Sequence, residues 1–163
     1  MHPLAGPRAR AYGRDCVGYL GLAVALLPVG LVLNQQVAFT RAGVVGVSAI
    51  LPVAATVIAA VRDSRLGTPG HRRAGLRVLD RQGRAPRLGR ALVRNAVKIG
   101  APWHVGHLVA VGAAYGGFER RDLGTLVPTV LVYAWIVAAA VAGATGSGRA
   151  LHDRVAGTEV GRR

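Results

Sequence analysis

Long uncharged stretches, separated by segments crowded with arginine, constrain this chain more than any other feature of its sequence. Residues 124–146 carry no charged side chain over 23 positions, residues 42–61 none over 20, and residues 16–33 none over 18. A helix that crosses the hydrocarbon core of a bilayer needs about 20 predominantly apolar residues. A soluble protein instead distributes its apolar residues in periodic stripes. The block pattern therefore predicts a membrane protein.

A fourth apolar stretch, residues 101–115, is interrupted by His104 and His107 and becomes long enough only when it is extended back toward Lys98. We predict an all-α integral membrane protein with a single domain over residues 1–163. Its parts are four transmembrane helices at about 16–33, 42–61, 97–115 and 124–146, a cytoplasmic loop at 62–96 and a cytoplasmic tail at 147–163.

The first apolar block follows a basic start, as the core of a signal peptide does. Its core is long, contains Pro28 and lacks a clear pattern of small residues for cleavage before residues 34–36. We therefore expect it to be retained as a span.

The basic residues orient these spans. The chain has 21 Lys+Arg against 7 Asp+Glu and a formal net charge of +14. Eleven of the basic residues fall in 62–98, three in 1–15 and four after residue 146, while the connections 34–41 and 116–123 together hold only three. With four spans, the segments rich in arginine and lysine lie on one side of the membrane. The positive-inside rule then assigns both termini and the long loop to the cytoplasm.

The basic loop carries signals of local structure. Residues 75–80 are β-prone, and residues 81–84 have the composition of a tight turn. Residues 88–98 place apolar side chains on one face and basic ones at a spacing of four on another, which predicts an interfacial amphipathic helix before the third span. Because the loop is held between spans, we expect its arginines to face anionic headgroups rather than nucleic acid. The basic residues assigned to this lipid-facing role are Arg72, Arg73, Arg77, Arg90, Arg94 and Lys98.

An ionisable cluster stands at the entrance of the first apolar block. Arg8 and Asp15 are seven residues apart, which is two helical turns or about 10 Å, so they share a helix face but are too distant for a direct ion pair within that helix. Asp153 is an available partner from the same side of the membrane, and Arg14 is an alternative partner for Asp15. Buried ionisable residues in membranes are paired or functional. Two readings stay open: a carboxylate that binds a cation or proton, and a structural clasp that fastens the tail beneath the first helix.

His104 and His107 form a secondary candidate site. A spacing of three puts both imidazoles on one helix face, within reach of a shared metal ion or proton path. Two nitrogens without carboxylate or cysteine companions make a poor metal site, and hydrogen bonds to a neighbouring helix explain them equally well. We expect no metal and no cofactor, and the lack of a nucleophile–base arrangement predicts that the protein is not an enzyme.

Three motifs in sequence order resemble the RDD family of small bacterial membrane proteins, named for one arginine and two aspartates. The first motif consists of Arg8, Ala11, Tyr12 and Asp15. The second has two parts, Thr68-Pro-Gly-His-Arg-Arg-Ala-Gly-Leu-Arg-Val78 and Leu88-Gly-Arg-Ala-Leu-Val-Arg-Asn95. The third is Leu151-His-Asp-Arg-Val-Ala-Gly-Thr158. His71 stands where lysine is usual, and Arg14 where an apolar residue is typical. The resemblance implies a multi-pass protein of the bacterial cytoplasmic membrane, and for some members an exchange of monovalent cations for protons.

The leading functional hypothesis is transport of small monovalent cations or protons, with Asp15 as ligand and Arg8 and Asp153 as its partners. The alternative is a non-transporting membrane scaffold or accessory protein whose basic loop binds anionic lipid or a partner protein. The many Gly and Ala residues in the spans favour close helix packing, which is compatible with a homo-oligomer as well as with packing inside one chain.

Overall fold

The computed structural model describes residues 2–37, 39–145 and 148–162 and is mostly helical. The end of the fourth predicted span, residue 146, and the first tail residue, 147, lie outside the described residues. The elements in chain order are α1 (Ala5–Gln36), α2 (Arg41–Ser48), α3 (Ile50–Asp63), α4 (Pro69–Arg73), β1 (Leu76–Asp80), α5 (Leu88–Asn95), the π-helix η1 (Ala96–Gly100), α6 (Ala101–Ala114), α7 (Leu123–Ala144), α8 (Leu151–Ala156) and β2 (Thr158–Arg162).

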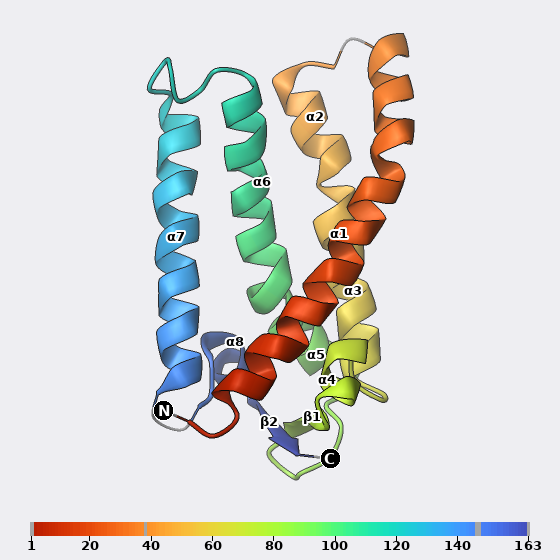
Figure 1. Ribbon diagram of the computed structural model, residues 1–163, viewed down its shortest axis with the longest axis vertical. Helices are drawn as coiled ribbons and strands as arrows, with labels where there is room; N and C mark the ends of the chain where they lie inside the picture. The colour runs from red at the N-terminus through yellow and green to blue at the C-terminus, as the bar shows by residue number, and fades with distance from the viewer. Residues whose placement is uncertain (1, 38, 146–147, 163) are drawn as a thin grey trace.

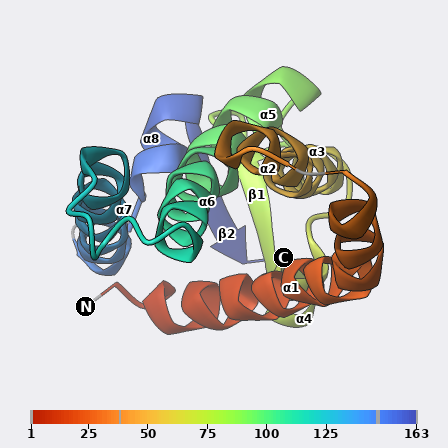
Figure 2. The same ribbon diagram turned by 90° about the horizontal axis from the view of Figure 1, so that it is seen from above.

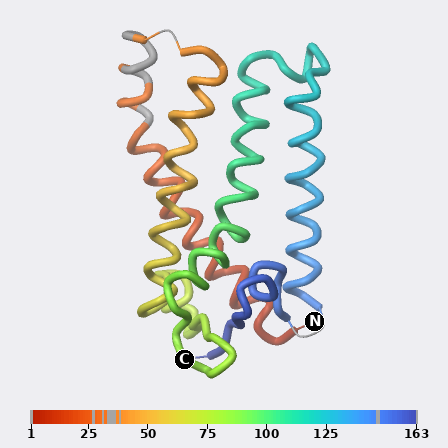
Figure 3. The backbone as a smooth tube through the Cα atoms, turned by 180° about the vertical axis from the view of Figure 1, so that it is seen from behind, coloured from red at the N-terminus to blue at the C-terminus, as the bar shows by residue number. Residues whose placement is uncertain are grey.

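The long helices extend from a base of short elements. Figure 1 shows α4, α5, α8 and both strands gathered at one end, with the connection between α6 and α7 at the other. Seen from above, α6 lies between α7 and the α2–α3 pair, and α1 runs along the front of the molecule (Figure 2). The view from behind shows the start of α1 and the C-terminal strand at the same end as the segment between α3 and α6 (Figure 3).

Two helical runs among the described residues are long and apolar enough to cross a membrane. They are Arg41–Asp63, which joins α2 and α3 and has a mean hydropathy of 2.4, and Leu123–Ala144, with a mean hydropathy of 2.1. Many α7 side chains are exposed, for example Val130 at 68% and Tyr133 at 65%, while the side that packs against α6 is half-buried. A helix that is apolar on all sides and not covered by protein is suited to lipid. The count of four spans is a prediction that these two helices do not test.

Two prolines explain where the helices change geometry. Pro52 has no N–H to donate to the carbonyl four residues earlier, and the chain is interrupted at Ala49 between α2 and α3. Pro102 likewise removes a donor one turn after Lys98, and the five residues before α6 form the wider π-helix η1. As a result α5, η1 and α6 follow one another without a loop.

The short sheet joins the middle of the chain to its C-terminal segment. Strands β1 and β2 pair antiparallel, with Val78 opposite Val160. Both valines are buried against Ala11 of α1, together with Leu76. After β1 the chain reverses because the Asp80 carboxylate accepts hydrogen bonds from the amides of Gln82 and Arg84. The sequence reasoning did not foresee β2, and this strand fixes the C-terminal segment directly beneath α1.

Candidate functional site

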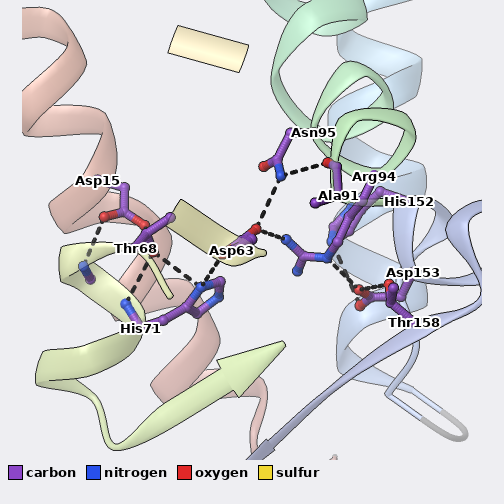
Figure 4. A network of polar contacts seen from close by, with 11 residues as sticks. Asp15, Asp63, Thr68, His71, Ala91, Arg94, Asn95, His152, Asp153 and Thr158 are labelled. Atoms are coloured by element: carbon purple, nitrogen blue, oxygen red, sulfur yellow. Dashed lines mark hydrogen bonds and ion pairs between the residues drawn. The ribbon is translucent and has the colours of Figure 1, made fainter. Parts of the chain in front are cut away.

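A continuous network of buried polar side chains lies where α1, α3, α4, α5 and α8 meet (Figure 4). It runs from Asp15 on α1 to Thr158 at the start of β2, and nearly all of its members are buried. Ionisable groups removed from water are costly unless they are paired or hydrogen-bonded. The partners of each aspartate therefore decide what the site can do.

The Thr68-Pro69-Gly70 motif holds the Asp15 carboxylate. The Thr68 hydroxyl donates to Asp15 Oδ2 at 2.6 Å, and the Gly70 amide donates to Asp15 Oδ1 at 2.8 Å. Thr68 is also the N-cap of α4, where its oxygen accepts from the His71 amide, and Pro69 follows in the first turn. A Cβ at Gly70 would overlap the Ala11 carbonyl and press on the Asp15 carboxyl. The motif is thus the close junction between α1 and α4.

Asp63, the last residue of α3, is the centre of the network. Its Oδ2 accepts from Arg94 Nη1 at 2.8 Å and from Asn95 Nδ2 at 3.0 Å, while its Oδ1 lies 3.3 Å from His71 Nδ1. Asn95 also donates to the Ala91 carbonyl, and its own Oδ1 is buried without a hydrogen-bond partner among the described residues.

Arg94 joins Asp63 to Asp153 of α8. Its Nε donates to Asp153 Oδ1 at 2.9 Å, and the side chain is only 1% exposed. Thr158 donates to the same oxygen at 3.3 Å. Burial by itself would raise the pKa of Asp153, but the Arg94 guanidinium outweighs it and holds that pKa below its usual range. Burial would lower the pKa of Arg94, and the two carboxylates raise it instead.

Two buried histidines border the ionic groups, and burial lowers the pKa of both. Burial lowers the pKa of His71, although its hydrogen bond to Asp63 acts in the opposite direction. Burial, assisted by the nearby Arg94 charge, lowers the pKa of His152 to about 3. His71 Nδ1 also lies 3.0 Å from the Thr68 hydroxyl, so its ring stands between the partners of Asp15 and Asp63. These contacts form one row: Asp15, Thr68, His71 and Asp63.

Arg8 does not form the ion pair with Asp15 or Asp153 that the sequence made available. Its guanidinium donates to the carbonyls of Gly148 and, at 2.8 Å, of Val160. Arg8 therefore holds the C-terminal segment through the backbone, with Asp153 near enough for their charges to interact. Arg14 is exposed and, within the described chain, lies outside ion-pair distance of Asp15. Asp15 and Asp153 belong to the same network, but Arg94 rather than Arg8 is its central cation.

Most of the predicted lipid-facing residues are exposed, but two are not on that surface. Arg72, Arg73, Arg77 and Arg90 are exposed. An open hollow of about 350 Å³ is lined by Pro69, Arg72 and Arg73. The prediction that Arg94 faces lipid is wrong, because its side chain is buried and points toward the carboxylates of Asp63 and Asp153. Lys98 also departs from it: the residue lies in η1, partly buried, with Nζ 5.0 Å from the centre of the Tyr12 ring.

The two histidines of α6 have separate partners. His104 Nδ1 lies 2.7 Å from the Gly100 carbonyl in its own helix, and His107 Nε2 contacts the Ser48 hydroxyl of α2. Within the described ranges, no three His, Cys, Asp or Glu side chains gather in a way that could hold a metal ion. The structure thus places His107 as a link between α2 and α6.

Sequence reasoning did not assign six residues of the network to the site: Asp63, Thr68, His71, Asn95, His152 and Thr158. A signal existed for Asp63, which follows an uncharged run of 20 residues only two positions after its end. Another signal was the adjacent pair Arg94-Asn95 inside the second quoted motif. Arg90 and Arg94 are one helical turn apart, and what the sequence did not contain was the packing of α3 and α8 that buries Arg94 while Arg90 stays exposed.

Apolar helices above a buried charge network define an α-helical, membrane-associated protein. The model of the RDD family matches residues 3–157, nearly the whole chain, so the chain belongs to the RDD family, as its motifs predicted. Comparison with curated proteins and with solved structures gave no match.

Proposed function

We propose that this RDD protein moves protons or small monovalent cations across the membrane, with the Asp15 carboxylate as their binding group. The observation that carries the proposal is the set of Asp15 partners. Asp63 and Asp153 each pair with the Arg94 guanidinium, whereas Asp15, only 6% exposed, receives hydrogen bonds from a hydroxyl and a backbone amide. A buried carboxylate without a paired cation gains the most from binding a proton or a cation.

The row Asp15, Thr68, His71 and Asp63 supports proton movement in particular. A hydroxyl both donates and accepts, and the contacts of His71 to Thr68 and to Asp63 are both made by Nδ1, which can take up a proton from one neighbour and then release it to the other. Each neighbour in the row lies within 3.3 Å of the next, from Asp15 Oδ2 to Asp63 Oδ1. A proton delivered to one carboxylate therefore has hydrogen-bonded groups along which to reach the other.

The test is a flux assay on the full chain in liposomes, with a pH-sensitive dye inside and a panel of Na⁺, K⁺ and Li⁺ gradients outside. Asp15→Asn keeps the shape of the side chain and removes its charge, so we expect folded protein and loss of flux. Asp122→Asn is the matched control, because Asp122 pairs with Arg41 at 2.6 Å and is not part of the network. Wild-type protein that is folded and carries no flux under any gradient would end the transport proposal.

The second candidate is a non-transporting scaffold that binds anionic lipid through its basic loop. The exposed arginines beside the hollow at Pro69 favour it, since juxtamembrane basic residues gain roughly 1 kcal/mol each near anionic lipid. The double substitution Arg72→Gln with Arg73→Gln should then reduce co-purification of anionic lipid, in a protein whose wild type carries no flux. Unchanged lipid binding by the double variant, or flux carried by the wild type, would contradict the non-transporting scaffold.

We further propose four spans with both termini and the 62–96 loop in the cytoplasm. Support comes from the charge distribution and from the position of the short elements, which lie together with the start of α1 at one end of the helices (Figure 1). In this orientation the buried network lies at the cytoplasmic end of the spans, where water can supply and remove protons.

A further inference from the structure

Lys98 is the only lysine among the 21 basic side chains of the protein. Every other member of this set is arginine, on exposed surfaces and in the buried network alike. The two side chains differ chemically in that an amine can release its proton, whereas a guanidinium remains charged in proteins. A lysine at one position of such a chain indicates a site where proton release is useful.

The surroundings of Lys98 differ from those of the arginines in the network. Arg94 has two carboxylate partners, but the Lys98 ammonium has no hydrogen-bond acceptor within the described chain and lies over the Tyr12 ring at 5.0 Å. A cation–π contact stabilises a charge less firmly than a paired carboxylate does. Lys98 also sits in the π-helix η1, and π-helical turns inside α-helices are frequent at functional sites.

Charged and titratable groups face Lys98 from several packed elements. Its charge interacts with those of Asp15 on α1, Asp63 on α3, Arg94 on α5 and Asp153 on α8. The titratable side chains Tyr12 and Cys16 of α1, His71 of α4 and His152 of α8 also lie within reach of this charge. The buried aspartates Asp15, Asp63 and Asp153 carry three negative charges, and Arg94 and Lys98 are positive side chains that interact with them. Release of the Lys98 proton therefore removes one positive charge from beside these carboxylates.

We propose that Lys98 is the proton-exchanging residue that alternates with a monovalent cation at Asp15. In the resting state the ammonium balances the Asp15 charge. When an Nζ–H bond breaks, the electron pair stays on nitrogen and the proton passes to water. The carboxylates then have one positive charge fewer beside them, and Asp15, which lacks an ion pair, takes up the cation. When Lys98 takes up a proton from water again, its positive charge expels the cation from Asp15. This inference rests on the proposed function and adds the identity of the residue that carries the proton.

Two buried oxygen atoms from residues next to η1 have no hydrogen-bond partner within the described part of the chain, which supports an alternating occupant. Asn95 Oδ1 lies one residue before η1, and the Tyr19 hydroxyl belongs to the same buried cluster as Ile99 of η1; neither has a hydrogen-bond partner among the described residues. Oxygen atoms without donors are ligands that a small hard cation or its water can use.

The only lysine of the chain permits a direct measurement. Full-length protein in nanodiscs, labelled with ¹³C at lysine Cε, gives one lysine resonance. In a titration that ends below the pKa of exposed lysine, about 10.4, we expect it to move from its charged to its neutral position. Asp15→Asn should make the ammonium lose its proton at lower pH, because the neighbouring negative charge that stabilises it is gone. A resonance that stays at the charged position throughout would overturn the inference.

Flux measurements separate this inference from the proposed function. Lys98→Arg retains the positive charge but cannot release a proton, so we expect at least a tenfold loss of exchange, while Arg90→Gln on the exposed face of α5 keeps wild-type exchange. Exchange by Lys98→Arg with the wild-type rate and pH profile overturns the role of Lys98 and leaves the transport proposal standing. Absence of flux in wild-type protein would overturn the transport proposal. It would also overturn the role of Lys98 as an exchange residue, even if the lysine resonance titrates as expected.

Discussion

The Arg94 guanidinium lies 2.8 Å from the Asp63 carboxylate, and the two side chains are among the most deeply buried in the protein. The contact links residues 31 positions apart and connects the end of α3 to the last turn of α5. Because Arg94 uses its Nε to reach Asp153 as well, one side chain holds three elements together. The network is therefore a structural joint even if Asp15 also binds ions.

Breaking this pair should destabilise the protein strongly. Asp63→Asn leaves the Arg94 charge with one carboxylate instead of two, and removing a partner from a buried ion pair costs about 3–5 kcal/mol. Arg94→Lys should be nearly as damaging, since an ammonium cannot reproduce the two divergent donors of the guanidinium. Thermal unfolding in detergent measures both. Asp122→Asn, at the partly exposed pair with Arg41, should cost much less, because solvent screens exposed ion pairs and leaves them little net contribution to stability. Equal losses for the two aspartates would contradict the buried joint.

Replacing Gly70 should separate α1 from α4. A Cβ in Gly70→Ala would overlap the Ala11 carbonyl, which cannot move without displacing α1, and would disturb both hydrogen bonds to Asp15. We expect a loss of about 1–3 kcal/mol, typical of overpacking. Gly89→Ala is the matched control, because that glycine is exposed in α5 with open space around it, and alanine there favours the helix by up to about 1 kcal/mol. A stable Gly70→Ala protein with an unchanged melting temperature would argue against the close junction.

The sequence predicted best those features that depend on a single helix or a single local motif. The apolar block that contains Val130 predicted the long helix α7, and the family motifs were confirmed over residues 3–157. The partners of the charged side chains were harder to predict from the sequence. Arg8 and Arg94 are both arginines near apolar segments, and only the packing of α5 against α3 and α8 decides that Arg94 meets the carboxylates while Arg8 binds carbonyls.

Strand β2 was missed for a related reason. Residues 158–162 are short and contain both a glycine and a charged side chain, so their local preference for a strand is weak. The strand forms because β1 offers an edge and because Val160 fills a gap beside Ala11. Such long-range pairing cannot be read from five residues alone.

Acidification should destabilise the folded protein through the buried histidines. His152 has a folded pKa of about 3, against about 6.5 for an exposed histidine, so the unfolded state binds more protons between these values. Stability is therefore full above about pH 6.5 and falls as the pH decreases toward 3, and the lowered pKa of His71 adds to the loss. Melting temperatures from pH 8 to pH 4.5 measure the effect. His152→Gln should flatten part of this dependence, and an identical slope in the variant would show that His152 does not contribute.

The proposed topology predicts that the two ends of the helices react from opposite sides of the membrane. In a Cys16→Ser background, which removes the only native thiol, cysteine is introduced at Gln82 in the turn after β1 or at Glu119 between α6 and α7; both positions are exposed. A membrane-impermeant maleimide applied to intact cells should label Glu119→Cys and leave Gln82→Cys unlabelled until the membrane is permeabilised. Labelling of Gln82→Cys in intact cells would invert the orientation, and labelling of both would contradict an odd number of crossings between them. With the expected result, Asp15 and the buried network lie at the cytoplasmic end, where the proton exchange proposed for Lys98 requires them.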